Sequence, residues 1–548
     1  MPSDAQESYS SSISFTETYK RHASSHPTLR EARCLEAFLP GVFRPIEAGD
    51  RLAGRVAYPP IGFSPEPGGF GYYCREDELR SLARDLGDEA RSRAEEAIAF
   101  WRNESTQSKC RAAYPPALAE ALPSDAWTVD SGVAFPLYRM AGLTPDFGEL
   151  LASGLPGLRN RIENGAALSR SPEFRGGMLA ALALMDRISL RYAIEADSAG
   201  MSALAAGLRS IPVRPPETLL EAMQLFWLYA LCSGSWNYGR MDVYLGPFLA
   251  RDLDSGRLAE EEALELLCSL WRLIQAYDNQ FNNRVYIGGK GRANEAEADR
   301  FALLALEATR IVGGSQPQLS LRFYGAQDRR LMDRALGLLA EGRTFPILYN
   351  DEAYVPAVAA ALGVSIEEAE DYSPFGCGEC VLPHRSAATP SGVINLLKAL
   401  EVSLHGGKDP LTGLAWGAPA PSDFASFEEL WDDYAARVER FVGALAEQER
   451  IEYEVAGSEA AFLFLSALYD DCVGRGLPLL SGGVRYLGGT IESYGDTNAA
   501  DSLIAIRKLV FEEKRLSLSE LVGACDGDFA GREDLRRLLL EAPKYGND

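Results

Sequence analysis

The most unusual stretch of the chain is Tyr372-Ser373-Pro374-Phe375-Gly376-Cys377-Gly378-Glu379-Cys380, which lies between two helical patterns. A glycine stands on each side of Cys377, and glycine lets the backbone turn sharply and lets another group approach closely. In an extended loop, side chains two residues apart point to the same side, so Cys377 and Glu379 would face one cavity. A partly buried carboxylate there is suited to general acid–base catalysis. We therefore predict that Cys377 and Glu379 are catalytic.

The same stretch allows two other interpretations. Cys377 and Cys380 have the C-x-x-C spacing, and His384 would add a third soft ligand, so a zinc or redox site must be considered. A structural zinc ion usually takes four ligands, and the sequence contains no second C-x-x-C, so we predict no metal. Buried core thiols are the remaining structural interpretation.

Alternating signals surround this loop. From residue 216 onward, helical patterns begin near Pro215–Glu217, at Glu260–Tyr277 and at an Asn294 cap that leads to Val312. Strand patterns follow at Gln318–Tyr324 and Phe345–Tyr349, and a helix is expected over Ser391–Leu404. Strand followed by helix predicts an α/β architecture, with a barrel covered by helices as one form of it.

The first part of the chain differs in character. Residues 1–25 are polar and rich in Ser and Glu, which predicts an N-terminal arm, and residues 26–215 are expected to be mainly helical, including Asp77–Trp101. Since no linker or low-complexity block follows, we expect residues 26–548 to form one continuous domain, with 216–548 as its main barrel part.

Composition narrows the function classes. The 548 residues are 47% hydrophobic and 24% charged, as in globular proteins. A net charge of −24 disfavours binding to nucleic acid or to an anionic membrane. The most apolar stretch, Leu219 to Cys232, is shorter than the roughly 18 residues of a membrane span, so we expect a buried helix there. No signal peptide pattern occurs, and the scattered cysteines fit a reducing cytoplasm.

Taken together, several motifs resemble the glycyl radical enzymes, the superfamily of pyruvate formate-lyase and the diol dehydratases. Gly376-Cys377-Gly378-Glu379 is similar to the family's Gly-Cys-x-Glu loop. Other segments match in the family's order from about residue 30 to the end: Gly239-Arg240-Met241-Asp242, Leu319-Ser320-Leu321-Arg322, Pro346 to Asp351, Ile394 to Glu401, Gly482-Gly483-Val484-Arg485-Tyr486, Ala500 to Lys514 and Ala542 to Asp548.

The resemblance implies a ten-stranded α/β barrel of the pyruvate formate-lyase type with surrounding helices, and Cys377 on a loop inside it. In the family this cysteine becomes a thiyl radical that removes a hydrogen atom from the substrate, and Glu379 matches an acid or base of the dehydratase-type members. Candidate substrate-binding or structural residues on the matching segments, with one histidine nearby, are Arg240, Arg322, Arg485 and His384.

Three departures from the family pattern shape the expectation. The radical-bearing glycine of the family lies in an Arg-Val-x-Gly-Tyr motif near the C-terminus, whereas this chain reaches its last residue at Tyr545-Gly546-Asn547-Asp548. Leu143 stands where diol-type members carry a histidine. Cys380 is a candidate second thiol, but it is not adjacent to Cys377 as the paired cysteines of pyruvate formate-lyase are.

We therefore expect the catalytic barrel subunit of a split glycyl radical enzyme, without a C-terminal glycyl radical domain and with no cofactor bound by the chain itself. The glycyl radical would come in trans from a small subunit, after activation by a radical S-adenosylmethionine enzyme. The expected activity is that of a lyase or dehydratase that cleaves a C–C, C–O or other C–X bond of a small polar metabolite, in a cytoplasmic homodimer. A separate glycyl polypeptide and a truncated chain both stay open. The alternatives for function are an inactive barrel remnant that binds a ligand and a formate acetyltransferase-like enzyme.

Overall fold

The computed structural model describes residues 4–65, 71–123, 132–138, 140, 142–277, 283–376, 378–421 and 423–546. The chain forms two compact units, and each unit is assembled from segments that are distant in sequence. Unit 1 takes residues 1–109, 139–389 and 453–488, and unit 2 takes residues 110–138, 390–452 and 489–548. Elements that run from one unit into the other are α5 (Thr106–Ala112), β12 (Ser386–Asn395), α18 (Phe427–Glu459) and β13 (Tyr486–Tyr494).

Unit 1 combines many helices with short strands. Its helices are α1 (Asp4–Arg21), α2 (Pro27–Val42), α3 (Glu76–Arg84), α4 (Asp88–Glu104), α7 (Phe147–Glu163), α8 (Pro172–Ser198), α9 (Ser202–Ser210), α10 (Leu219–Ser233), α11 (Met241–Asp254), α12 (Glu260–Ala276), α13 (Glu295–Val312), α14 (Arg329–Ala340), α15 (Asp351–Leu362), α16 (Ile366–Ala369), α19 (Leu463–Ala467) and α20 (Cys472–Arg475). Its strands are β1 (Phe43–Arg44), β2 (Arg55–Val56), β3 (Ile61–Ser64), β4 (Gly71–Cys74), β6 (Asn237–Arg240), β7 (Arg284–Gly288), β8 (Gln318–Phe323), β9 (Ile347–Asn350), β10 (Ser373–Phe375) and β11 (Glu379–Val381).

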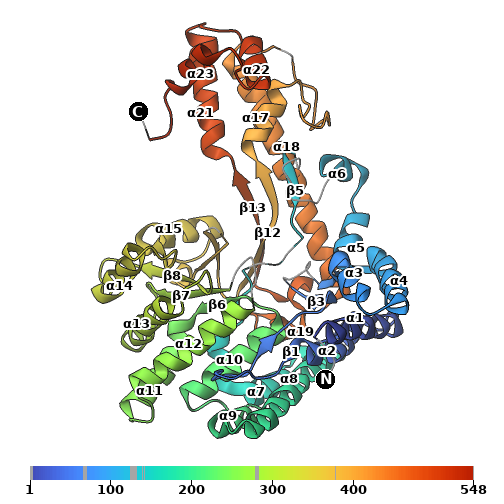
Figure 1. Cartoon of the computed structure of the whole chain (residues 1–548), viewed down its shortest axis with the longest axis vertical. Helices are drawn as coiled ribbons and strands as arrows, with labels where there is room; N and C mark the ends of the chain where they lie inside the picture. Colours follow the sequence, from blue (N-terminus) through green and yellow to red (C-terminus); the bar gives the residue numbers. More distant parts are fainter. Residues whose placement is uncertain are drawn as a thin grey trace. The chain divides into compact units, whose positions relative to one another are not determined.

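Unit 1 contains a four-stranded parallel sheet in the order β6-β7-β8-β9. Because side chains alternate along a strand, each strand presents two different faces. Val285, Ile287, Leu319 and Leu321 form a fully buried apolar face, and helices α11 and α13 contact β7 (Figure 1). The opposite face is polar, which is unusual for a parallel sheet covered on both sides.

Most helix positions follow from local sequence signals. Helix α10 begins after Thr218, whose hydroxyl accepts the Glu221 N–H at 3.2 Å, and it ends at Gly234 in the left-handed conformation. Helices α12 and α13 lie within one or two residues of the predicted ranges, and β8 coincides with the predicted alternating strand. The predicted buried helix from Leu219 to Cys232 is confirmed, because the described side chains there are buried from Ala222 onward.

Three local predictions need correction. Within the expected polar arm over residues 1–25, Asp4–Arg21 form helix α1, in which Phe15 and Tyr19 are fully buried. The expected helix over Asp77–Trp101 divides into α3 and α4, because Gly87 between them adopts a φ of 101°. The expected helix from Ser391 begins only at Leu396, since the preceding residues extend β12 and Asn395 caps α17 (Leu396–Leu404).

Unit 2 is built around a smaller sheet. The strands β13, β12 and β5 (Ala134–Pro136) are adjacent in that order, and β12 pairs with β5 in antiparallel register. The other helices of this unit are α6 (Pro116–Ala121), α17, α21 (Asp496–Ile506), α22 (Leu518–Asp526) and α23 (Glu533–Leu540).

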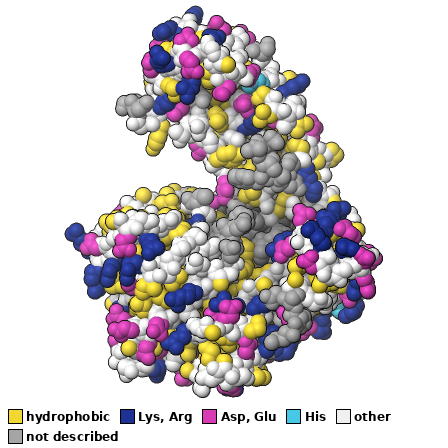
Figure 2. All heavy atoms as spheres, in the orientation of Figure 1, with side chains coloured by type: hydrophobic (Ala, Val, Ile, Leu, Met, Phe, Trp, Pro, Cys, Tyr) yellow, Lys and Arg dark blue, Asp and Glu magenta, His cyan; other side chains and the backbone are white. Residues whose placement is uncertain are grey.

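The surface carries charges of both signs. In the face drawn in Figure 2, basic and acidic side chains are mixed, and neither sign covers a continuous area. In the part of the chain that the structure describes, every helix is too short or too polar to cross a membrane.

Candidate active site

The predicted reactive stretch forms a tight antiparallel hairpin. Strands β10 and β11 pair in the register Ser373↔Val381, Pro374↔Cys380 and Phe375↔Glu379. The turn is closed by a hydrogen bond of 3.0 Å from the Gly378 N–H to the Phe375 carbonyl oxygen. Gly376 and Gly378 adopt φ values of 54° and 133°, which side chains with a Cβ atom rarely adopt. The two glycines are therefore required by the turn; Cys377 between them lies outside the described residues.

Glu379 lies directly against this turn. A Cβ atom on Gly376 would lie 2.5 Å from both carboxylate oxygens of Glu379, so any larger residue would displace the carboxylate. Glu379 follows Gly378 and opens β11, so its side chain is held beside the loop that carries Cys377. This geometry brings the predicted acid or base to the predicted thiol loop.

Cys380 occupies the other face of the hairpin. Its side chain packs against a buried apolar cluster that includes Val355, Tyr372 and Leu382, and its Sγ lies 3.6 Å from the Gly378 carbonyl oxygen. Burial raises the pKa of the Cys380 thiol to about 12. A thiol in this state is not a nucleophile at neutral pH, because the thiolate is the reactive form. The arrangement gives no support to the formate acetyltransferase alternative, which needs a second reactive thiol beside the first.

Three tyrosines that the sequence analysis did not single out surround the hairpin. A Cβ atom on Gly378 would lie 3.2 Å from the Tyr354 Oη and 4.0 Å from the Tyr349 Cε1. The rings of Tyr349 and Tyr354 are perpendicular, with centroids 5.3 Å apart. Burial raises the pKa of Tyr349 to about 12 and that of Tyr286 well above its ordinary value, and Glu379 contributes to both shifts. These hydroxyl groups stay neutral. The Tyr286 hydroxyl donates to Asn237 Oδ1 at 3.1 Å, and those of Tyr349 and Tyr354 are the ones that can donate to a ligand.

The polar face of the parallel sheet has unused hydrogen-bonding capacity. Buried polar atoms on this face or on the adjacent β10 have no hydrogen-bond partner within the described ranges, namely Asn237 Nδ2, Arg284 Nε and Nη1, Gln318 Oε1, Ser320 Oγ and Ser373 Oγ. Asn237, Arg284 and Gln318 are direct register partners on β6, β7 and β8. Because buried polar groups are almost always paired, such a concentration indicates a surface built for a ligand.

Two of the predicted arginines are internal to the fold. Arg322 is fully buried, and its Nε and Nη2 lie 3.0 Å and 2.8 Å from the two carboxylate oxygens of Asp351. The Arg322 guanidinium also lies over the ring of Tyr372, with its central carbon 3.9 Å from the ring centroid. Arg240 is also buried and donates to the backbone carbonyls of Glu370, Gly288 and Lys290. These contacts assign both side chains to holding loops together.

Arg485 and His384 lie together beyond the hairpin. The Arg485 Nη2 is 3.1 Å from Asp471 Oδ1 and 3.5 Å from Asp470 Oδ2. The His384 Nδ1 is 3.4 Å from Asp470 Oδ2, and the His384 ring lowers the pKa of the Asp470 carboxyl. The His384 backbone also bonds to Thr144 and Asp470. These contacts connect the segments around Thr144, His384 and Asp470–Arg485. They support the structural role for Arg485, which was one of the two roles that the sequence allowed.

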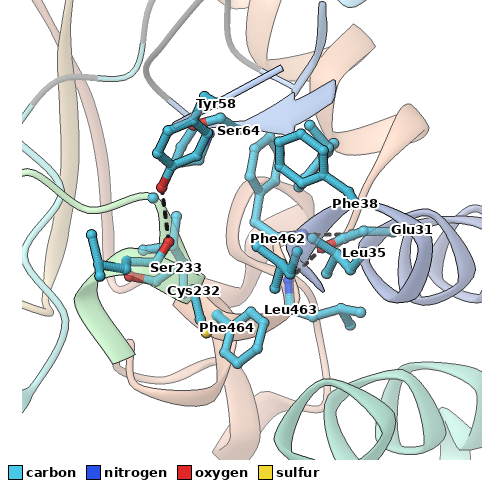
Figure 3. Close-up of a pocket in the computed structure, with 16 residues that line it drawn as sticks. Glu31, Leu35, Phe38, Tyr58, Ser64, Cys232, Ser233, Phe462, Leu463 and Phe464 are labelled. Carbon is cyan, nitrogen blue, oxygen red and sulfur yellow. Dashed lines mark hydrogen bonds between the residues drawn. The ribbon is translucent and has the colours of Figure 1, made fainter. Parts of the chain in front are cut away.

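A separate cavity in unit 1 was not predicted (Figure 3). It measures about 20 Å³, which is room for one water molecule, and apolar side chains such as Phe38 and Phe464 line most of it. Glu31 lies at its edge and accepts the N–H groups of Ala461, Phe462 and Leu463 at 2.6–2.9 Å. Burial raises the pKa of Glu31 to about 7. Glu31 thus anchors the start of α19 to α2, and the cavity is too small for a metabolite.

The described residues do not provide further ligands for the zinc site that the C-x-x-C spacing suggested. Across residues 4–546, apart from the segments left undescribed, no group of three or more His, Cys, Asp and Glu side chains is arranged to hold a metal ion. His384 itself is directed to Asp470. Cys377 lies outside the described residues, so the distance between the two cysteines of the C-x-x-C pair is not described.

In this arrangement the polar face of a parallel sheet contacts a glycine-rich turn through Arg284 and Gly376, and comparison with known proteins identifies the family. The chain belongs to the pyruvate formate lyase-like family, whose model matches residues 2–548. The predicted superfamily is therefore confirmed. The predicted α/β fold is confirmed by the glycerol-bound B12-independent glycerol dehydratase from Clostridium butyricum, with a TM-score of 0.85, 23% identity and coverage of 98% of this chain and 73% of that one.

Curated relatives are lyases and dehydratases. The chain is 33% identical to isethionate sulfite-lyase of Oleidesulfovibrio alaskensis over 62% of this chain and 44% of the relative. It is 26% identical to trans-4-hydroxy-L-proline dehydratase of Clostridioides difficile over 98% of this chain and 74% of the relative. The chain thus spans less than half the length of the isethionate sulfite-lyase.

Proposed function

We propose that this chain is the catalytic barrel of a glycyl radical lyase or dehydratase that acts on a small polar metabolite. The observation that carries the proposal is the β10–β11 turn, which holds Glu379 beside the loop of Cys377 next to a buried polar sheet face. The lyase and dehydratase relatives support the same reaction class.

In the proposed reaction, Cys377 gives its thiol hydrogen atom to a glycyl radical and becomes a thiyl radical. The thiyl sulfur then removes one hydrogen atom from a substrate carbon, which re-forms the S–H bond and leaves the radical on the substrate. Glu379 exchanges a proton with the substrate hydroxyl or leaving group while the neighbouring C–X bond breaks. The product radical finally takes the hydrogen atom back from Cys377. Hydrogen-atom transfer needs no thiolate, so a histidine partner is unnecessary.

The glycyl radical would be held outside these 548 residues, because no Arg-Val-x-Gly-Tyr motif occurs among them. We propose that it is supplied in trans by a small glycyl-radical-bearing polypeptide, after that polypeptide has been activated by a radical S-adenosylmethionine enzyme. A glycine on a further part of the same polypeptide would serve the same chemistry, and the experiment below separates the two sources.

The proposed function is tested by reconstitution without oxygen. The purified chain is mixed with a separately expressed glycyl radical domain, an activating enzyme and S-adenosylmethionine, and then with isethionate, glycerol, 1,2-propanediol and trans-4-hydroxy-L-proline. We expect a glycyl signal by electron paramagnetic resonance and a product from at least one substrate. Turnover that occurs only when a glycyl domain is fused to the chain would contradict supply in trans. A glycyl signal without product in either format would favour the inactive binding barrel.

Replacement of Glu379 by Gln is expected to lower turnover by about 10²- to 10⁴-fold, the usual contribution of a general acid or base. Gln keeps the size of the side chain but cannot accept or release a proton, so substrate affinity should change little. The measurement is kcat and KM of the reconstituted enzyme. Glu352→Gln, on the exposed start of α15, is the matched control and should behave as wild type. Equal turnover of Glu379→Gln and wild type would remove the acid–base role.

A further inference from the structure

Arg284 is a buried cation that the mechanism above does not use. It opens β7, is 6% exposed, and donates through Nη2 to the Gly376 carbonyl oxygen at the start of the reactive turn. Its Nε and Nη1 are buried without a hydrogen-bond partner in the described structure. A buried charge without a counter-charge is costly, so its presence calls for a reason.

The other buried arginines differ from Arg284 because each of them has a carboxylate partner. Within the described ranges, each of the other arginines in the buried class reaches a carboxylate, as Arg30 with Glu459, Arg240 with Asp371, Arg292 with Asp299, Arg322 with Asp351 and Arg437 with Asp433. Among the described residues, no Asp or Glu carboxylate oxygen lies within 4.0 Å of a guanidinium nitrogen of Arg284. Among the buried arginines that the structure describes, Arg284 is the one without a carboxylate counter-ion.

Most of the side chains around Arg284 are polar and uncharged, and the Glu379 carboxylate lies on the other side of Gly376, without an ion pair to Arg284 within 4.0 Å. Its register partners are Asn237 on β6 and Gln318 on β8, and both have an unpaired buried side-chain atom. Tyr286 and Tyr349 lie close enough for Arg284 to lower their pKa values, although burial raises both overall. Of these groups, the unpaired Asn237 Nδ2 and the Tyr349 hydroxyl are donors that could reach an anion beside Arg284, whereas the Tyr286 hydroxyl already donates to Asn237 Oδ1.

We propose that Arg284 binds the anionic group of the substrate, a carboxylate or a sulfonate, and thereby positions a neighbouring carbon at Cys377. This inference rests on the proposed function, because it names the substrate class of the same site. A planar guanidinium suits both oxyanions through paired hydrogen bonds. Since Gly376, which Arg284 contacts, is next to Cys377 in the chain, the anionic group and the reacting carbon must be close together, and the substrate is a short-chain acid.

The test measures binding and needs no radical. Isothermal titration calorimetry of the purified chain uses three probes: isethionate as the sulfonate, glycerate as the carboxylate and glycerol as the neutral analogue. We expect wild type to bind at least one acid and to prefer it to glycerol. Arg284→Gln should weaken acid binding about 10- to 100-fold, in line with hydrogen bonds to charged groups, and leave glycerol unchanged. Arg284→Lys should lie between the two.

Stability separates a ligand-binding role from a structural one. Because Arg284→Gln removes a buried charge without a counter-ion, the Tm of the ligand-free chain should stay within a few degrees of wild type or rise, whereas a structural arginine would lower it. The exposed Arg329→Gln is the matched control and should change neither binding nor Tm. Unchanged acid binding in Arg284→Gln, or no acid binding by wild type, would overturn the proposal. Acid binding that depends on Arg284 in a chain without turnover would keep the anion site and reject the proposed reaction.

Discussion

Replacement of Cys377 by Ala is expected to abolish turnover of the reconstituted enzyme, down to the background of the mixture without the chain. In the proposed reaction the Cys377 sulfur takes a hydrogen atom from the substrate carbon and later returns it. Alanine has no S–H bond and cannot carry out either transfer. The glycyl signal of the partner should persist, because that radical does not reside on Cys377. The measurement pairs product analysis with electron paramagnetic resonance on the same samples.

Cys380→Ala is the matched control, because it removes the same atom three residues away. Cys380 faces the apolar cluster around Tyr372, so its loss should cost stability by about 1 kcal/mol, as typical substitutions do, and leave turnover within a few fold of wild type. A variant that lacks Cys377 and still forms product would reject the thiyl mechanism. Complete loss of turnover in Cys380→Ala, with the fold intact, would instead assign the second thiol a part in the chemistry.

The reactive turn was predictable because its signal is local. Glycines at 376 and 378 meet a backbone requirement that acts within three residues, and the register of β10 with β11 then fixes Glu379 beside them. Strand β8 was equally predictable, since its alternation follows directly from the pleat of a strand. The same reasoning failed at Ser391, where helix-like residues pair with the distant β5 and extend a strand. Local propensity yields there to a tertiary contact.

The roles of the arginines were beyond the sequence. Arg322 and Arg284 are both basic residues on short strands, and their roles differ because Arg322 has a carboxylate partner and Arg284 has none among the described residues. That partner, Asp351, comes from a helix 29 residues further along the chain. Similarly, the tyrosines at the turn come from β7, from β9, which is separated from β7 by β8, and from α15, the helix that follows β9. Contacts across a sheet are not visible in one segment, so the polar face had to be found in the structure.

Replacement of Asp351 by Asn is expected to lower the free energy of unfolding of unit 1 by about 3–5 kcal/mol, the usual cost of breaking a buried ion pair from one side. Asp351 accepts from Arg322 Nε and Nη2, from the Tyr372 hydroxyl at 2.8 Å and from the Lys290 N–H at 2.7 Å. Asparagine keeps the shape but removes the charge, so the fully buried Arg322 is left without a counter-ion. The penalty is therefore the desolvation of a cation and not only a lost hydrogen bond.

The measurement is urea unfolding of the full chain, with hydrogen exchange of β8 and β9 peptides to report on unit 1 alone. Asp333→Asn, which removes one partner of the exposed Arg329–Asp333 pair, is the control and should change neither quantity, because solvent screens that pair. The double replacement Arg322→Met with Asp351→Leu should recover much of the lost stability, since no unpaired charge remains. Unchanged stability in Asp351→Asn would contradict the structural assignment of Arg322. It would then return Arg322 to the candidate substrate-binding residues, because an arginine whose counter-ion can be removed without cost is one that the fold does not need.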